Sequence, residues 1–156
     1  MNSLKEKNMP DPLLKVDHVT ISYNGEATVQ DVSFELKQGE ILGIVGESGS
    51  GKTTVIRAVM GLLPGGGKVT EGDIKLDGTS LLSYSPEQWR NIRGTDISMI
   101  FQDSGAMMNP IRTIGTEFRE FLAVHGIKDD KEAHDLMISM IEMVRLPNPE
   151  HILKCY

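Results

Sequence analysis

Five short segments of the chain have the hydrophobic and polar pattern of β-strands. Residues 13–23 are rich in β-branched side chains, while 29–37 and 69–77 alternate between apolar and polar positions. Alternation with a period of two predicts strands with one buried face. Residues 40–45 form a nearly continuous apolar run, and 97–101 are also apolar and strand-like. A continuous run such as 40–45 is typical of a strand buried on both faces, as in a parallel sheet.

Apolar residues recur at helical spacing in three other segments, 55–63, 111–125 and 133–144. Residues 85–88, Ser-Pro-Glu-Gln, have the features of a helix start: a serine cap, a proline suited to the first helical position, and a glutamine that completes a capping box. Residues 146–150 contain two prolines and predict a loop. The first two-thirds of the chain is therefore expected to be mixed α/β, and the last third helical.

This change of pattern divides the chain into three expected parts. Residues 1–12 are polar and are expected to form a flexible leader, because they lack the apolar core of a signal peptide. Residues 13–103 are expected to form an α/β core, and 104–156 the beginning of a helical subdomain. The hinge between them is expected at 104–110, where glycine and an Asn-Pro pair occur.

Composition and charge narrow the possible functions. The 156 residues include 16 Lys and Arg against 22 Asp and Glu, a formal net charge of −6. This acidic balance argues against a nucleic-acid binder, which needs a basic face to neutralise phosphates. Cys155 is the single cysteine, so no disulfide can form within the chain. No apolar run approaches the length of a membrane-spanning helix, so a membrane role would have to come through a partner.

One motif carries recognisable chemistry. It is the Walker A pattern, Gly-x-x-x-x-Gly-Lys-Thr, within the stretch Gly46-Glu47-Ser48-Gly49-Ser50-Gly51-Lys52-Thr53-Thr54. Its glycines let successive backbone N–H groups turn inward and form a nest for an anion, and the following helix adds its positive N-terminal end. Lys52 supplies a charge for the β- and γ-phosphates, and Thr53 offers a hydroxyl to Mg²⁺. A glycine-rich turn that merely contains a lysine is disfavoured, because the motif follows an apolar run and opens a helix.

Taken in order, these features resemble the ATP-binding subunit of an ABC transporter. The resemblance rests on Tyr23, on 29–37 and 39–45, on the Walker A motif, and on Phe101-Gln102-Asp103. The peptide-importer branch, which includes oligopeptide, dipeptide and nickel importers, is the more similar one. That closer similarity rests on the motif itself and on Leu62-Leu63-Pro64, Met108-Asn109-Pro110 and Leu146-Pro147-Asn148-Pro149. Together these features cover residues 13–156.

The resemblance implies roles for individual residues. Residues 46–54 would bind ATP with Mg²⁺. Tyr23 matches the aromatic residue that stacks on adenine, although a tyrosine at a strand end also commonly packs on a neighbour. Gln102 matches the catalytic glutamine that reaches toward Mg²⁺ and the attacking water, although a polar residue ending a strand is the simpler reading. Thr53 and Gln102 are therefore the implied metal ligands.

The resemblance also implies a fold and partners. The fold would be a P-loop NTPase core, with a mixed sheet that has antiparallel strands near the N-terminus, joined to the start of a helical subdomain. The domain would be incomplete. The helical part would face transmembrane permease subunits, a second ATPase subunit would complete a dimer, and a substrate-binding protein would act indirectly. The subunit would lie peripherally on the cytoplasmic face of the membrane.

Three motifs of this family do not occur in these 156 residues: the Leu-Ser-Gly-Gly signature, the strand that ends in Asp-Glu, and the switch histidine. Phosphoryl transfer needs a group that orients the attacking water. We therefore expect the full-length protein to couple ATP hydrolysis to uptake of peptides or nickel. The 156-residue chain is expected to bind Mg²⁺-ATP weakly and to hydrolyse it negligibly. An apolar edge around 41–45 would then favour self-association.

Other readings stay open at this point. One is another P-loop protein, such as a small-molecule kinase or a GTPase. A GTPase would be expected to contain Asn-Lys-x-Asp, which does not occur here, and a kinase would be expected to carry an arginine-rich lid, whereas the arginines are scattered. Another reading is a non-catalytic module that responds to nucleotide. The sequence does not identify the transported substrate.

Overall fold

The computed structural model describes residues 11–103 and 105–156, which fall into two compact units, one ending at Met99 and the other beginning at Ile100. Most of the expected flexible leader, residues 1–10, lies outside the described residues. Each unit has its own hydrophobic core. The predicted functional division into 13–103 and 104–156 stays a prediction.

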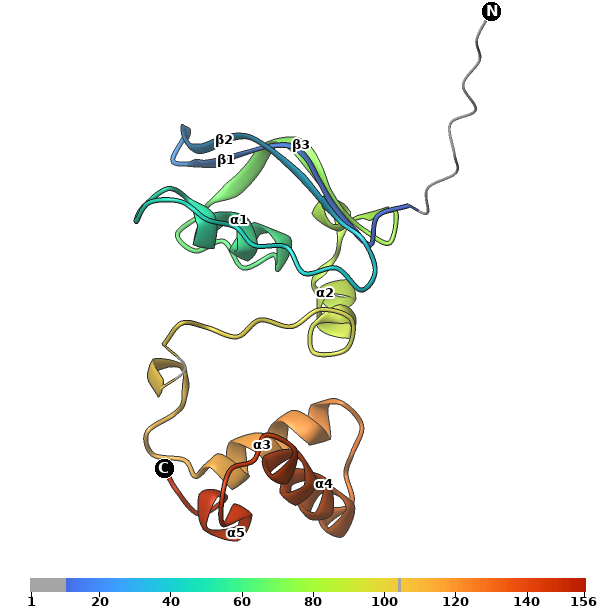
Figure 1. Ribbon diagram of the computed structural model, residues 1–156, viewed down its shortest axis with the longest axis vertical. Helices are drawn as coiled ribbons and strands as arrows, with labels where there is room; N and C mark the ends of the chain where they lie inside the picture. The colour runs from blue at the N-terminus through green and yellow to red at the C-terminus, as the bar shows by residue number, and fades with distance from the viewer. Residues whose placement is uncertain (1–10, 104) are drawn as a thin grey trace, which may run out of the picture. The chain divides into compact units, whose positions relative to one another are not determined.

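The first unit is built on a four-stranded sheet in which every neighbouring pair of strands is antiparallel (Figure 1). The strand order is β2-β1-β3-β4. The strands are β1 Leu14–Tyr23, β2 Glu26–Leu36, β3 Lys68–Leu76 and β4 Thr79–Ser80. The three strands predicted from alternation are confirmed, and the antiparallel strands near the N-terminus agree with the expected fold class.

Two tight turns set the register of this sheet. Asn24 and Gly25 join β1 to β2 with φ angles of 52° and 86°, and Asp77 and Gly78 join β3 to β4 with 49° and 76°. Two successive residues with positive φ match the right-handed twist of a hairpin, which explains why Asn-Gly and Asp-Gly occupy these positions.

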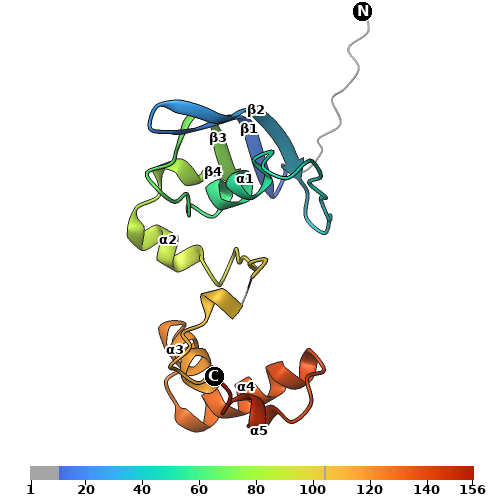
Figure 2. The same ribbon diagram turned by 90° about the vertical axis from the view of Figure 1, so that its left-hand side faces the viewer.

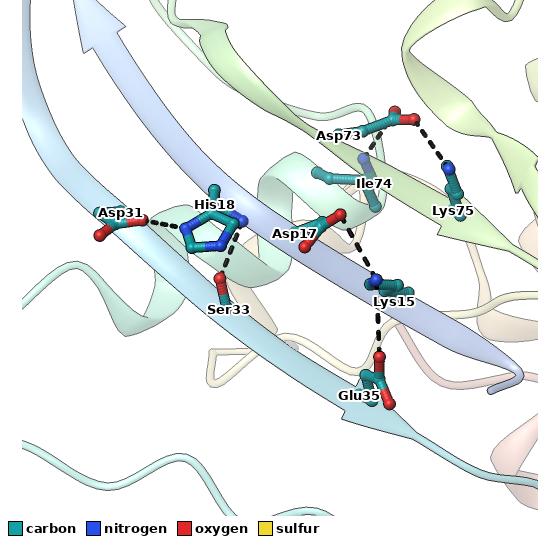
Figure 3. A network of polar contacts seen from close by, with 9 residues as sticks. All are labelled: Lys15, Asp17, His18, Asp31, Ser33, Glu35, Asp73, Ile74 and Lys75. Atoms are coloured by element: carbon teal, nitrogen blue, oxygen red, sulfur yellow. Dashed lines mark hydrogen bonds and ion pairs between the residues drawn. The ribbon is translucent and has the colours of Figure 1, made fainter. Parts of the chain in front are cut away.

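Helix α1, Lys52–Val59, packs against one face of the sheet (Figures 1 and 2). The buried side chains of this core come from the strands, from one face of the helix and from Leu81, which follows β4. They are Val16, Val19, Ile21, Val29, Val55, Ala58, Val59, Ile74 and Leu81. The opposite face of the sheet carries charged side chains (Figure 3). This one-sided burial is what the period-two pattern predicts.

A short 3₁₀ turn, Leu81–Ser83, leads to helix α2, Pro86–Ile92. The predicted capping box is present: the Gln88 backbone N–H donates to Ser85 Oγ at 3.3 Å, and the Ser85 backbone N–H donates to Gln88 Oε1 at 2.9 Å. The start of α2 is therefore encoded locally, by the four residues that the sequence singles out.

The two strands predicted from apolar runs are wrong for this chain. Neither 40–45 nor 97–101 forms a strand, and Ile41 and Val45 are 100% and 91% exposed. Parallel pairing among the described residues is limited to an isolated bridge between Arg93 and Ile97. A central strand needs neighbours on both sides for its backbone groups, and none of the four described strands pairs with either segment. The parallel part of the expected mixed sheet is therefore not formed here.

The second unit is helical. Its helices are α3 Ile114–Val124, α4 Asp130–Met143 and α5 Pro149–Ile152, preceded by a 3₁₀ turn, Gly105–Met107. Leu122, Ala133, Met137, Ile141 and Leu153 form its core. The two longer helices agree with the predicted periodicity. The predicted loop at 146–150 is partly wrong, because Pro149 occupies the first position of α5, where a missing N–H costs nothing.

Candidate functional site

The Walker A residues form the loop that leads into α1. Gly49 and Gly51 have φ angles of 81° and 88°, which L-residues with a side chain rarely adopt. The Ser50 N–H donates to the Glu47 carbonyl at 3.2 Å, and the Val55 N–H makes the first helical bond to the Gly51 carbonyl at 3.0 Å. The loop is therefore a tight turn that delivers the chain directly into the helix.

Space as well as backbone conformation requires glycine in this loop. A Cβ at Gly46 would lie 2.9 Å from Ser50 Oγ, and a Cβ at Gly51 would lie 2.7 Å from Val29 Cγ2. Because such short contacts force neighbouring atoms to move, a larger residue at either position would displace the Ser50 or the Val29 side chain. The motif glycines are thus explained by the geometry of this chain.

The Lys52 side chain folds back over the loop. Its Nζ donates to the carbonyls of Gly46 and Glu47 at 2.8 and 2.5 Å, and to Ser50 Oγ at 3.2 Å. These contacts place the ammonium charge at the centre of the turn. A phosphate binding here would meet that charge together with the N–H groups of the helix start.

The N-terminal end of α1 is open to an anion. Gly51 is the N-cap and provides no side-chain cap, and the first turn contains no acidic residue. The first N–H groups of the helix are therefore not taken up by a carboxylate or hydroxyl. Thr53 lies exposed in this turn, as do Glu47 and Ser48 in the loop, while Thr54 is half-buried.

The residues present fit a magnesium nucleotide better than a metal bound by protein alone. Within residues 11–103 and 105–156, no three His, Cys, Asp or Glu side chains gather in a way that could hold an ion. Mg²⁺ usually keeps several waters and takes one or two protein ligands beside the phosphates. The exposed Thr53 hydroxyl suits that arrangement.

A cavity of about 510 Å³ adjoins the loop. Its walls include Val29, Val32, Phe34 and Leu42, with Gly46 and Lys52 at one side. The space lies between β2 and the apolar segment 40–45, which pairs with none of the described strands. Its walls are largely apolar away from the loop, so a phosphate would be better suited to the loop side, where Gly46, Ser50, Gly51 and Lys52 lie.

The other two predicted site residues, Tyr23 and Gln102, lie outside the Walker A segment. Tyr23 is half-buried at the end of β1 and its ring packs on Gly67, where an added Cβ would lie 2.4 Å from Tyr23 Cε1. This contact is the packing role that the sequence left open beside adenine stacking. Gln102 is exposed and belongs to the second unit. Both assignments stay predictions.

A network of polar contacts on the outer face of the sheet has no counterpart in the sequence analysis (Figure 3). His18 Nδ1 lies 2.6 Å from Asp31 Oδ1, and the His18 backbone N–H donates to Ser33 Oγ at 2.8 Å. His18 and Asp31 both have positive φ, at irregularities in the strand pairing. The hydrogen bond to Asp31 and its negative charge raise the pKa of His18.

Sequence reasoning also missed Trp89 and Arg93, which contact the far end of α1. The only available signal was that two residues four positions apart lie on the same side of a helix. That signal does not reveal which distant backbone groups the side chains meet.

Comparison with known proteins decides the family. The family model described as ABC transporter matches residues 29–152. This chain belongs to the ABC transporter family. Membership sets aside the kinase and GTPase readings, and it agrees with the resemblance carried by the Walker A motif.

The relatives of this ABC transporter chain include import subunits for peptides and metals. The metal-staphylopine import system ATP-binding protein of Staphylococcus aureus is 39% identical over 146 residues, covering 92% of this chain and 54% of the relative. The dipeptide transport ATP-binding protein of Bacillus subtilis is 40% identical over 151 residues, covering 94% and 45%. The chain thus spans about half the length of the curated relatives it matches. These names agree with the predicted peptide and nickel importer branch.

Solved structures support the fold. A subunit from Clostridium perfringens described as part of an ABC transporter complex aligns with a TM-score of 0.68 at 23% identity, covering 93% of this chain and 54% of that one. A dimeric ATP-binding cassette in a post-hydrolysis state, bound to ADP and Pi, aligns with a TM-score of 0.72 at 23% identity, covering 91% and 60%. At this identity the similarity shows the fold alone. Among the described helices, none is long and apolar enough to cross a membrane.

Proposed function

We propose that this chain is the nucleotide-binding part of an ABC importer ATPase subunit and that it binds Mg²⁺-ATP at residues 46–54. The observation that carries the proposal is the position of Lys52, whose ammonium lies 2.8 and 2.5 Å from the Gly46 and Glu47 carbonyls at the open start of α1. A lysine held over a glycine turn at a helix N-terminus is an arrangement suited to a phosphate.

Each loop residue has a distinct part in this proposal. Backbone N–H groups of the loop and of the first turn of α1, other than that of Ser50, donate to phosphate oxygens, an arrangement that the positive φ angles of Gly49 and Gly51 favour. Lys52 exchanges its contacts with the loop carbonyls for contacts with the β- and γ-phosphates. Thr53 offers its hydroxyl to the metal. Bound Mg²⁺ supplies positive charge that neutralises the phosphates.

The remaining assignments follow from family membership. Tyr23 stacks on adenine, and Gln102 contributes a ligand to Mg²⁺ and orients the attacking water. The helical part, 104–156, contacts transmembrane permease subunits, and a second ATPase subunit completes the dimer. A substrate-binding protein delivers the cargo, and the subunit acts at the cytoplasmic face of the membrane. The cargo is peptides or nickel, a proposal that the names of a metal-staphylopine import protein and a dipeptide transport protein among the relatives support.

Hydrolysis is assigned to the full-length protein and not to these 156 residues. No apolar run in the sequence ends in Asp-Glu, so the group that would orient water beside Gln102 is not among them. The chain alone is expected to bind nucleotide and to release phosphate negligibly. Lys52-dependent phosphate release by the chain would overturn this part of the proposal.

Titration of the 156-residue chain with Mg²⁺-ATP tests the binding site directly. Lys52→Ala removes the charge at the centre of the loop and is expected to weaken binding about tenfold or more, the usual scale for a charge-assisted contact. Lys128→Ala is the matched control, because Lys128 is exposed in the second unit. Its affinity should equal that of the wild type. Equal affinity of the wild type and Lys52→Ala would refute the phosphate-binding assignment.

A further inference from the structure

The C-terminal end of α1 is closed by a Schellman motif. Gly61 has a φ of 62°, its N–H donates to the Ala58 carbonyl at 3.0 Å, and the Leu62 N–H donates to the Arg57 carbonyl at 2.8 Å. This arrangement uses two of the carbonyls that every helix leaves unpaired at its end. The carbonyls of Met60 and Gly61 take part in neither of these two bonds.

Arg93, at the end of α2, donates to both of these carbonyls. Its Nε donates to the Met60 carbonyl at 3.0 Å and its Nη2 to the Gly61 carbonyl at 2.9 Å. The planar guanidinium is suited to such paired contacts, which lysine cannot reproduce. A positive charge at this end also faces the negative pole of the α1 dipole.

Trp89 holds the arginine and the glycine together. The Arg93 guanidinium carbon lies 4.6 Å from the centroid of the Trp89 ring, within the range of a cation–π contact. The same ring packs on Gly61 so closely that an added Cβ would lie 2.5 Å from Trp89 Cζ2. Trp89 and Arg93, one turn apart at the end of α2, therefore both contact the end of α1: the arginine through two hydrogen bonds and the tryptophan through its ring. We call this set, Gly61, Trp89 and Arg93, the α1 clamp.

The two ends of α1 differ in how firmly they are held. At the N-terminal end, the helix starts from the Walker A loop without a side-chain cap, and the preceding segment is exposed, with Val45 at 91%. At the C-terminal end, the clamp adds two charge-assisted hydrogen bonds and a ring contact. Because a helix of eight residues behaves as one short rod, holding one end restricts the tilt of the other.

We propose that Arg93 is a positioning residue for the phosphate-binding loop: it acts through α1 and fixes the place of Lys52 without touching nucleotide. The inference rests on the proposed function, since the nucleotide is what the positioned loop would bind. It adds to that function a group more than thirty residues beyond the motif, on a helix that the Walker A pattern does not include.

The test uses Arg93→Met and Arg93→Lys in the 156-residue chain, with Arg90→Met as the matched control. Arg90 lies on the same helix and is exposed. The first readout needs no nucleotide: amide hydrogen exchange of the peptide covering 46–54. Arg93→Met is expected to accelerate this exchange, Arg93→Lys to restore it only partly, and Arg90→Met to leave it unchanged.

The second readout is the affinity for Mg²⁺-ATP. Arg93→Met is expected to weaken binding roughly threefold to tenfold, the range of a coupling carried through one packed element.

Trp89 is the single tryptophan, so its fluorescence emission reports on the α1 clamp. Nucleotide should shift that emission in the wild type and not in Arg93→Met. A general loss of stability is controlled for by Gly78→Ala, which strains the turn between β3 and β4, where an added Cβ would meet nothing within 4 Å. After correction for the folded fraction, this variant should keep the wild-type affinity.

The outcomes separate the two proposals. Unchanged exchange at 46–54 in Arg93→Met overturns the positioning role, whether or not nucleotide binds. Faster exchange with unchanged affinity for Mg²⁺-ATP overturns the positioning role as well, because loosening the loop would then not affect nucleotide binding. Faster exchange in Arg93→Met, together with a wild type that does not bind Mg²⁺-ATP, supports the mechanical link and refutes the proposed function.

Discussion

Gly72, in the middle of β3, is a position where one methyl group should destabilise the first unit severely. The pairing of β1 with β3 passes from Asp17 opposite Asp73 to Thr20 opposite Glu71. His18 and the following valine therefore face the single residue Gly72, which is the geometry of a β-bulge. At this point the two backbones approach closely, and Gly72 has a φ of 78°.

The free energy of unfolding that Gly72→Ala is expected to lose has two contributions. A left-handed conformation costs an L-residue with a side chain about 1–2 kcal/mol. The new Cβ would also lie 2.3 Å from the carbonyl oxygens of Asp17 and His18, about 1 Å closer than the carbon–oxygen contacts common between strands. Backbone atoms cannot rotate away, so relief requires a shift of β1 that weakens ladder hydrogen bonds of about 1 kcal/mol each. The expected total is about 3–4 kcal/mol.

Gly78→Ala is the matched control. Gly78 has a φ of 76°, almost the same as Gly72, but a Cβ there would meet nothing within 4 Å. The stability of this variant should therefore fall only by the cost of the left-handed conformation, about 1–2 kcal/mol. The difference between the two variants isolates the backbone contact.

Equilibrium urea unfolding followed by Trp89 fluorescence measures this difference, because the single tryptophan lies in the same unit as both glycines. The expected result is a loss for Gly72→Ala that exceeds the loss for Gly78→Ala by about 2 kcal/mol. Equal losses would show that the strand approach is not as close as described, and the reasoning would fail.

Three further predictions concern other parts of the chain. The pKa of His18, followed by NMR, should lie above 6.5 and should fall toward that value in Asp31→Asn, because Asp31 is its main partner. The associated stabilisation is present below pH 6.5, the unfolded value, and is lost as pH rises through the higher folded pKa. Ser85→Ala removes the cap of α2 and should cost about 1 kcal/mol in urea unfolding. Met137→Ala should destabilise the second unit by about 2–5 kcal/mol, measured by hydrogen exchange of α4, whereas Met143→Ala, at a 77% exposed position, should change little.

Each of these predictions has a result that contradicts it. A wild-type His18 whose pKa is not raised would mean that the contact with Asp31 does not persist in solution. A Ser85→Ala variant as stable as the wild type would mean that packing, and not the cap, determines where α2 begins. Equal effects of Met137→Ala and Met143→Ala would place the core of the second unit elsewhere.

Local signals explain which elements the sequence predicted. The first three strands of the sheet follow from alternation and β-branched content together with the turn pairs at Asn24 and Asp77, and α2 follows from its capping box. All of these depend on residues close together in the chain. The Walker A loop belongs to the same class, because its glycines, Lys52 and Thr53 are contiguous. The place of Gln102 relative to the loop depends on chain folding across two units, which no local pattern contains.

The wrong strand predictions and the contacts that the sequence did not reveal have one physical cause. The segment 40–45 has the composition of a buried strand, but a strand exists only when a neighbour takes up its hydrogen bonds, and the composition of one segment does not supply that neighbour. The bulge at His18 and Gly72 and the grip of Arg93 on the end of α1 are also contacts between distant residues. Each required the tertiary structure, since its energy depends on distances that sequence order does not specify.

By itself, therefore, the sequence determined a family, a Walker A motif and the elements whose patterns are complete within ten or fifteen residues. Tertiary structure decided how that motif is held. It showed Lys52 folded onto the loop carbonyls, the start of α1 open to an anion, and the far end of the same helix clamped by Trp89 and Arg93. The reason is that a short helix takes its direction from what packs against it and not from its own residues.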